Sequence, residues 1–252
     1  MYDAIVLAGG INSEQLRQYS RAEYEALIEI GGKPMVSFVV DALLNVAEIR
    51  NVVVVGPRSE LNRYFDNDRV KLVENGDGIM ENVLLALANM QPTERVVVAT
   101  GDIPLLTPEA VRDFIDCCAR FDADFYYPIV AKEENEKNYP GMRRTYVRLR
   151  EGVFTGGNIF LVNPQVVKQC VEAAKGIIAY RKQPVQLCRI LGFKFILQYF
   201  LGTLTLPEVA KRVSEILTLR GAVVVSTYPE VGIDVDKPSD LDLVRSRFAL
   251  RA

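Results

Sequence analysis

Histidine and tryptophan are both absent from this chain of 252 residues. Without histidine no Ser-His or Cys-His nucleophile pair can form, and the commonest general base is missing. The four cysteines form neither a CxxC pair nor a Cys/His cluster, which argues against a zinc centre; they are Cys117, Cys118, Cys170 and Cys188. An enzyme of this composition has to work with carboxylates, Lys and Arg, backbone amides and a bound metal.

Long apolar runs and an excess of positive charge are also lacking. The most apolar late stretch, Ile190–Leu206, is interrupted by Lys194, Gln198 and Gly202, and falls short of the roughly 20 apolar residues of a membrane span. No signal peptide is apparent at the start of the chain. The net charge of −2 and the pI near 5.5 do not fit a nucleic-acid binder. We expect a cytoplasmic protein, its cysteines reduced, that binds neither membranes nor nucleic acid.

Short β-branched runs alternate with helical patterns in the first half of the chain. The expected strands are Asp3–Leu7, Asn51–Val55, Val70–Val73 and Arg95–Thr100. The expected helices are Pro34–Ala47, Met80–Met90 and one that Thr107 caps. Continuously apolar strands separated by helices are typical of a parallel sheet that is covered on both faces. The pattern therefore predicts an α/β fold, a three-layer sandwich around a mostly parallel mixed sheet.

The pattern changes after Asp124. Further strands are expected at Phe125–Val130, Tyr146–Arg150, Asn158–Val162 and Ala222–Ser226, with a polar loop at Ala131–Met142 and a final helix from Lys237 to Ala252. Residues Pro164–Leu219 are expected to be almost wholly helical, with breaks near Gly192, Gly202 and Pro207. Because no linker or repeat is visible, we expect a single domain, 1–252, with a helical insertion at about 164–220. The charges of this insertion are read as a solvated face, with an acceptor lid or a homodimer surface as alternatives.

Two of the expected strands end in residues that suit a phosphate and a metal, at the edge where ligands of open α/β sheets bind. After the first strand, Gly9 and Gly10 allow the backbone to approach a phosphate, although a simple tight turn is the alternative. Neither GxGxxG nor GxxxxGK[ST] is present. After the fourth strand, Asp102 sits on a turn fixed by Gly101 and Pro104, either as a Mg²⁺ ligand or in an Asx turn.

A third candidate segment lies near the end of the chain, Gly232-Ile233-Asp234-Val235-Asp236-Lys237-Pro238. Side chains alternate in an extended segment, so Asp234 and Asp236 are expected to face the same way. Two carboxylates on one face repel each other unless a cation lies between them, which favours metal binding. Asp240 is interpreted as the cap of the last helix.

The order LAGG, GGKPM, GDIPLL and GIDVDKPSDL resembles the nucleotidyltransferases of the MobA-like group, over about residues 3–110 and 222–245. The resemblance implies the nucleotide-diphospho-sugar transferase fold and a site for a nucleoside triphosphate with Mg²⁺. The implied metal ligands are Asp102 and an acid of the Asp234/Asp236 pair. Gly76, Gly78 and Asn82 occupy the place where relatives recognise the base. The alternative is that this segment is only a loop leading into the N-terminus of a helix. The nucleotide-binding candidates are Leu7, Ala8, Gly9, Gly10, Gly76, Gly78, Asn82, Gly101 and Asn158.

The chain departs from its relatives at Glu25, which aligns with a lysine that neutralises the triphosphate in them. A carboxylate at this position repels phosphate. Arg17 or Arg21, in the same loop, are the candidates to replace that charge as catalytic residues.

The expected reaction moves a nucleoside monophosphate from GTP or CTP to a phosphorylated small-molecule acceptor and releases pyrophosphate. A phosphate nucleophile is already ionised and needs no general base, in agreement with the lack of histidine. A non-catalytic nucleotide or sugar-nucleotide binder is the alternative that Glu25 favours. A nucleotide-sugar glycosyltransferase is a third reading, against which stands the single acid of Gly101-Asp102-Ile103-Pro104.

Overall fold

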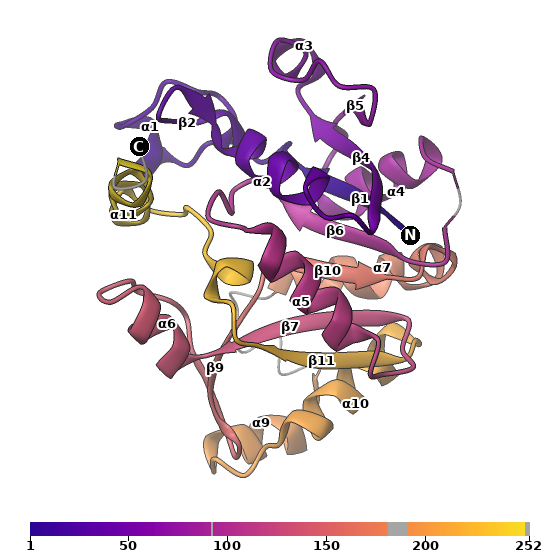
Figure 1. Ribbon diagram of the computed structural model, residues 1–252. Helices are drawn as coiled ribbons and strands as arrows, with labels where there is room; N and C mark the ends of the chain where they lie inside the picture. The colour runs from indigo at the N-terminus through magenta and orange to yellow at the C-terminus, as the bar shows by residue number, and fades with distance from the viewer. Residues whose placement is uncertain (92, 181–190, 250–252) are drawn as a thin grey trace.

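The computed structural model describes residues 1–91, 93–180 and 191–249, and within them nine strands form one mixed sheet (Figure 1). The strand order is β5-β4-β1-β6-β10-β7-β9-β8, and β11 pairs with β7 outside this path. The strands are β1 (Tyr2–Leu7), β4 (Ile49–Gly56), β5 (Val70–Glu74), β6 (Val96–Thr100), β7 (Phe125–Ala131), β8 (Val147–Leu149), β9 (Gly152–Gly156), β10 (Ile159–Val162) and β11 (Gly221–Ser226). Pairing is parallel along β5-β4-β1-β6 and between β7 and β11, and antiparallel elsewhere in this sheet.

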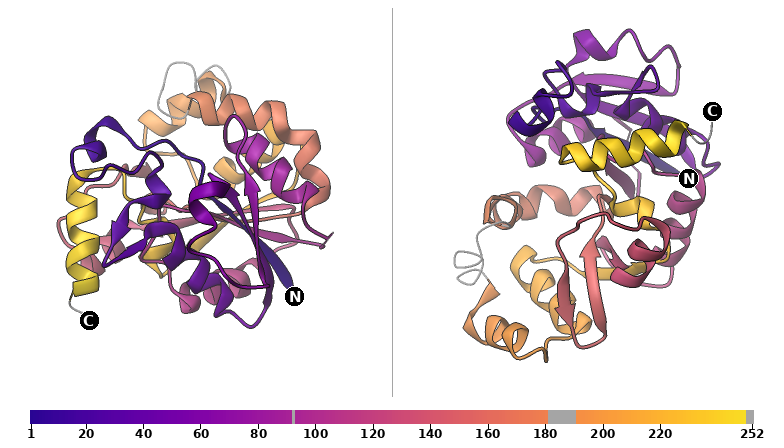
Figure 2. Two further views of the ribbon diagram at one scale, coloured as in Figure 1. Left: turned by 90° about the horizontal axis from the view of Figure 1, so that it is seen from above. Right: turned by 90° about the vertical axis from the view of Figure 1, so that its left-hand side faces the viewer.

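The side chains of β1 alternate between two apolar cores, one on each face of the sheet. Ala4 and Val6 belong to the core that also contains residues of α2 (Met35–Leu44) and α5 (Pro108–Cys118). Ile5 belongs to the core under α4 (Ile79–Ala88) and α7 (Pro164–Tyr180). Figure 2 shows these helix pairs on opposite sides of the sheet. The α/β three-layer fold with a mostly parallel mixed sheet is therefore confirmed.

The C-terminal segment returns to the loop that follows β1. A third apolar core joins Leu16 and Ile28 of that loop to Ile233 and Val235, and to Leu241 of helix α11 (Pro238–Ala249). In Figure 2 helix α11 lies beside the N-terminal part of the molecule. The short elements of this region are α1 (Glu14–Arg17), the 3₁₀ turns η1 (Glu25–Leu27) and η2 (Pro229–Gly232), β2 (Glu29–Ile30) and β3 (Lys33–Pro34). A further short helix, α3 (Arg58–Leu61), lies against β5.

The prediction of a polar loop at residues 131–142 is wrong, because Lys132–Asn138 form helix α6. Glu133 and Glu134 in the first turn and Lys137 in the last turn complement the helix dipole. Lys132 and Glu136 form an i,i+4 ion pair. Helix α6 has no apolar stripe, so hydrophobic periodicity does not predict it. Only the spacing of its charges indicates a helix.

The stretch after β10 is helical in its described part. It consists of α7, α9 (Phe193–Phe200) and α10 (Leu206–Leu217), and α9 is bounded by Gly192 and Gly202. A capping box of Thr205 and Glu208 opens α10. Cys188 lies outside the described residues, and the other three cysteines are free thiols.

Candidate active site

The carboxyl ends of β1 and β6 lie side by side in parallel register, Leu7 opposite Thr100. The Gly101 amide donates to the Leu7 carbonyl at 2.8 Å. A Cβ on Gly101 would lie 3.1 Å from the Ala26 Cβ and 3.2 Å from the Leu7 oxygen. Only glycine fits this close approach without displacement, and it places Asp102 directly beside the turn that follows β1.

The C-terminal segment reaches the same edge of the sheet. The Val235 amide donates to the Asp102 carbonyl at 3.0 Å. The Asn158 carbonyl accepts from the Thr100 amide at 3.0 Å, and the Asn158 amide donates to Val231 at 2.7 Å. The structure thus brings Asp102, Asn158 and the segment of Asp234 and Asp236 together.

The loop after β1 folds back so that Glu25 lies against the glycine turn. The Glu25 amide donates to the Gly10 carbonyl at 2.9 Å, and an antiparallel bridge joins Ile11 to Tyr24. A Cβ on Gly10 would lie 3.8 Å from Oε2 of Glu25. The carboxylate of Glu25 is therefore held at Gly10 by the backbone of its own loop.

Glu25, Asp102 and Asp236 form a carboxylate group in which one oxygen from each residue lies within 4.8 Å of the others. Oδ1 of Asp102 is buried and has no hydrogen-bond partner among the described residues. Burial raises the pKa of Asp102 to about 7, the charges of Asp234, Glu25 and Asp236 add to the rise, and the Thr100 hydroxyl opposes it. An orphaned buried oxygen next to two more carboxylates suits a hard divalent cation, which binds oxygen ligands. The residues present therefore fit the Mg²⁺ that the family resemblance implies.

Asp234 is not a member of this three-residue group, but its charge also acts on Asp102, and metal binding by Asp234 stays a prediction. It forms an ion pair with Arg144, whose side chain is only 11% exposed and also donates to the Gly232 and Asp234 carbonyls. Burial raises the pKa of Asp234, and Arg144 opposes this shift. Arg144 thus neutralises Asp234 and fixes the segment that presents Asp236, a role that sequence reasoning did not assign.

The predicted base-recognition segment lies against the glycine turn. A Cβ on Gly9 would lie 2.8 Å from the Asn75 Cβ and 3.2 Å from Nδ2 of Asn82. Oδ1 of Asn82 accepts from the Gly76 amide at 2.8 Å, and Gly78 has a φ of 98° at the start of α4. Oδ1 of Asn75 is buried without a hydrogen-bond partner in the described part of the chain. Asn75 is a further candidate that the sequence did not single out, because it lies in a loop without periodicity.

The two arginines proposed to replace the family lysine have no described contact with the carboxylate group. Nε of Arg17 donates to the Asn12 carbonyl at 3.1 Å, within its own loop. Arg21 is exposed. Neither forms an ion pair within the described residues. The catalytic role of Arg17 and Arg21 stays a prediction.

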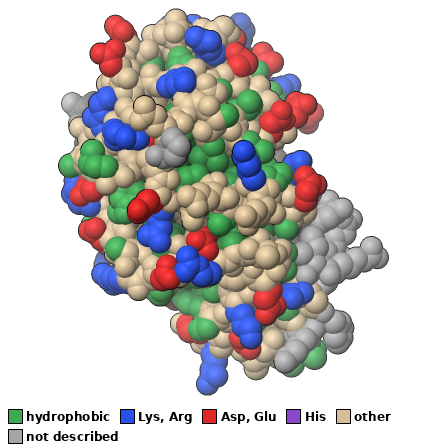
Figure 3. Space-filling model, turned by 90° about the vertical axis from the view of Figure 1, so that its right-hand side faces the viewer, with side chains coloured by type: hydrophobic (Ala, Val, Ile, Leu, Met, Phe, Trp, Pro, Cys, Tyr) green, Lys and Arg blue, Asp and Glu red, His purple; other side chains and the backbone are tan. Residues whose placement is uncertain are grey.

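The surface carries charges of both signs. On the face drawn in Figure 3, Lys and Arg are interspersed with Asp and Glu. Among the described residues, no helix combines the length and apolar character that crossing a membrane requires.

Comparison with solved structures shows which class of fold this chain has. A solved structure of a hypothetical transferase from Thermus thermophilus is similar, with 40% identity and a TM-score of 0.83 over 95% of this chain and 99% of that one. A CMP:2-keto-3-deoxy-manno-octonic acid synthetase complexed with CTP shares the fold, at 15% identity and a TM-score of 0.61 over the whole of both chains. The fold is thus that of the nucleotide-diphospho-sugar transferases.

The family is narrower than the fold class. Residues 4–187 match the MobA-like NTP transferase domain, and the chain belongs to this family. The bifunctional protein GlmU of Thermoanaerobacter pseudethanolicus is 27% identical over 117 residues, which cover 44% of this chain and 24% of GlmU. The match thus spans about a quarter of the length of that curated relative. Family and neighbours together identify the chain as nucleotidyltransferase-like.

Proposed function

We propose that this protein transfers a nucleoside monophosphate from GTP or CTP to a phosphorylated small-molecule acceptor and releases pyrophosphate. The observation that carries the proposal is the carboxylate group of Glu25, Asp102 and Asp236 beside the Gly9-Gly10 turn. Phosphoryl-type transfer requires ligands for a cation and donors for phosphate oxygens, and the carboxylate group and the glycine turn would supply them at the carboxyl ends of two parallel strands.

The residues divide the work between charge and alignment. Asp102 and Asp236 would hold Mg²⁺, which supplies charge neutralisation to the phosphates when bound. The amides of Gly9 and Gly10 would receive phosphate oxygens, and the absence of side chains there allows close approach. An ionised acceptor phosphate attacks the α-phosphorus without a general base, so catalysis rests on holding the reactants in line. The chain contains no histidine to act as such a base.

Asn75 and Asn82 are proposed to recognise the base. Amide side chains both donate and accept hydrogen bonds and can therefore match the edge of guanine or cytosine. Asn82 is 6% exposed and its Oδ1 is engaged by Gly76, which fixes the orientation of its Nδ2 toward the glycine turn. The remaining helical segment, about 164–220, is proposed as an insertion in a single domain that covers the acceptor or a second copy of the chain.

Pyrophosphate release tests the proposal. The protein is assayed with each of the four common triphosphates, Mg²⁺ and a panel of sugar phosphates and other phosphorylated acceptors. We expect turnover with GTP or CTP, and a loss of at least about 100-fold in Asp102→Asn. Asp242→Asn, an exposed acid on α11, is the matched control and should retain full activity. Equal rates in the two variants would exclude the role given to Asp102.

A non-catalytic nucleotide binder is a second candidate, because no described contact brings Arg17 or Arg21 to the carboxylate group. This alternative predicts nucleotide-dependent thermal stabilisation with Mg²⁺ and no pyrophosphate with any acceptor. A glycosyltransferase would instead release a free nucleoside diphosphate from a nucleotide-sugar. The product assay separates the three.

A further inference from the structure

We propose that Glu25 is a third carboxylate ligand of the divalent cation, so that the protein binds the cation before it binds any nucleotide. This inference rests on the proposed function, because the cation concerned is the one that the transfer would use. It assigns a role to the residue that departs from the family pattern, where a carboxylate alone would repel the triphosphate.

The backbone places Glu25 independently of any ligand. Its amide is hydrogen bonded to Gly10, it opens the η1 turn, and the next residue, Ala26, packs under Gly101. Glu25 is thereby fixed between the two strand ends that also position Asp102. Its backbone is thus fixed at the site, and one of its carboxylate oxygens lies within 4.8 Å of those of Asp102 and Asp236.

The distances suit direct coordination. Ligand oxygens on opposite sides of an octahedral Mg²⁺ lie about 4.2 Å apart, from a metal–oxygen distance of about 2.1 Å, and those of larger cations lie somewhat farther. The three carboxylate oxygens lie within 4.8 Å of one another, so small side-chain rotations bring them to these spacings. Independently of this cluster geometry, Oδ1 of Asp102 is buried without a hydrogen-bond partner in the described residues. A buried orphan acceptor of this kind requires a donor or a cation.

The third carboxylate changes how positive charge reaches the triphosphate. A lysine at this position carries the charge itself, whereas Glu25 supplies it through a more tightly bound cation. Three carboxylates make binding possible without help from substrate phosphates, which Mg²⁺ sites of one or two carboxylates usually need. Nucleotide binding should then depend strictly on the cation.

Binding of Mn²⁺ in the complete absence of nucleotide tests the inference. Free Mn²⁺ is measured by its electron paramagnetic resonance signal during titration of the wild type, Glu25→Gln, Asp102→Asn and Glu29→Gln. Loss of an outer-shell partner costs about 10- to 100-fold in metal affinity, and loss of a direct ligand should cost no less. We expect at least a 10-fold weaker affinity in Glu25→Gln and in Asp102→Asn. Glu29→Gln, an exposed acid on β2 outside the group, should remain within about 2-fold of the wild type.

A wild type that binds no Mn²⁺, or a Glu25→Gln variant with the affinity of Glu29→Gln, would overturn the inference. Thermal unfolding of each variant establishes that it is folded. Glu25→Lys provides a second test, since it should lose Mn²⁺ binding while nucleotide stabilises it in the presence of EDTA. Nucleotide stabilisation that still requires the cation in Glu25→Lys would count against the inference. Because these readouts involve no turnover, Glu25-dependent Mn²⁺ binding without pyrophosphate release would refute only the proposed function, and the converse only this inference.

Discussion

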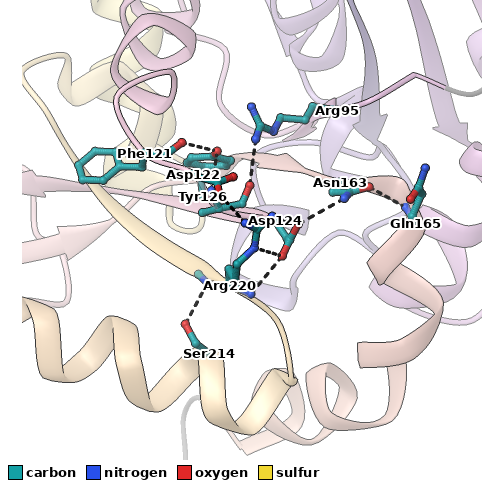
Figure 4. A network of polar contacts seen from close by, with 11 residues as sticks. Arg95, Phe121, Asp122, Asp124, Tyr126, Asn163, Gln165, Ser214 and Arg220 are labelled. Carbon is teal, nitrogen blue, oxygen red and sulfur yellow. Dashed lines mark hydrogen bonds and ion pairs between the residues drawn. The ribbon is translucent and has the colours of Figure 1, made fainter.

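Asp124→Asn should destabilise the protein through one polar cluster at the end of the sheet opposite the candidate site (Figure 4). Asp124 precedes β7, and its carboxylate accepts from Nε and Nη2 of Arg220 at 2.9 and 3.0 Å. Asn163, which follows β10, donates to Oδ1 of Asp124 at 3.3 Å. The carboxylate thus joins the ends of three strands, β7, β10 and β11.

The magnitude follows from the pKa of this carboxyl. The hydrogen bonds from Arg220 lower the pKa of Asp124 from 3.8 to about 2, against a smaller effect of burial. At about 1.4 kcal/mol per pH unit, this corresponds to at most about 2.5 kcal/mol of folding free energy. Because the Arg220 side chain is 58% exposed, solvent screening reduces the effect, and we expect about 1–2 kcal/mol.

Urea denaturation followed by circular dichroism measures the change, with Asp122→Asn as the control. Asp122 pairs with the same arginine, but its side chain is 80% exposed, so its loss should cost less than about 0.5 kcal/mol. The melting temperature of Asp124→Asn should fall by about 2–8 °C. Since the folded pKa lies below the unfolded one, the advantage of Asp124 is complete above about pH 4 and is lost as the pH falls toward 2. Equal destabilisation by the two variants, or a difference that persists at pH 2, would refute the reasoning.

Three further substitutions have defined outcomes. Gly9→Ala should weaken nucleotide binding at least about 10-fold, because its Cβ would lie 2.8 Å from the Asn75 Cβ and displace the turn; calorimetric titration checks this. Thr218→Gly should raise the free energy of unfolding by up to about 1 kcal/mol in urea, since Thr218 has a φ of 55°. Asp102→Asn should make the cation-free protein more stable at pH 8 than the wild type, because the raised pKa of Asp102 means that stability falls as the pH rises from about 4 to 7. A lower melting temperature of this variant in EDTA at pH 8 would contradict that sign.

The sheet could be predicted from the sequence because its strands are buried on both faces. Runs such as Val52–Val55 and Val96–Ala99 are apolar throughout, and burial of both strand faces requires this. The position of Asp102 follows from the same pattern, since the turn after a buried strand emerges at the carboxyl end of that strand. Helix α6 could not be predicted from hydrophobic periodicity, because charge pairs stabilise it and it has no apolar stripe.

The partners of Asp102 were harder to predict. Arg144 lies in a polar loop, and its ion pair with Asp234 is a tertiary contact that no local pattern indicates. The sequence alone shows Glu25 only as a repulsive departure from the family, because the return of its loop to Gly10 rests on a backbone bridge without a sequence signature. Side chains placed by long-range backbone contacts are not visible in local periodicity.

The return of the C-terminal segment to the β1 loop also has a consequence for biosynthesis. Asp236 leaves the ribosome long after Glu25 and Asp102 have been translated, and the third apolar core closes only when Ile233 and Val235 arrive. A nascent chain that has already paired β1 with β4 and β6 would contain only two of the three carboxylates and would bind the cation weakly. Tight binding of the cation would then occur only after the segment that contains Asp236 has packed against the β1 loop.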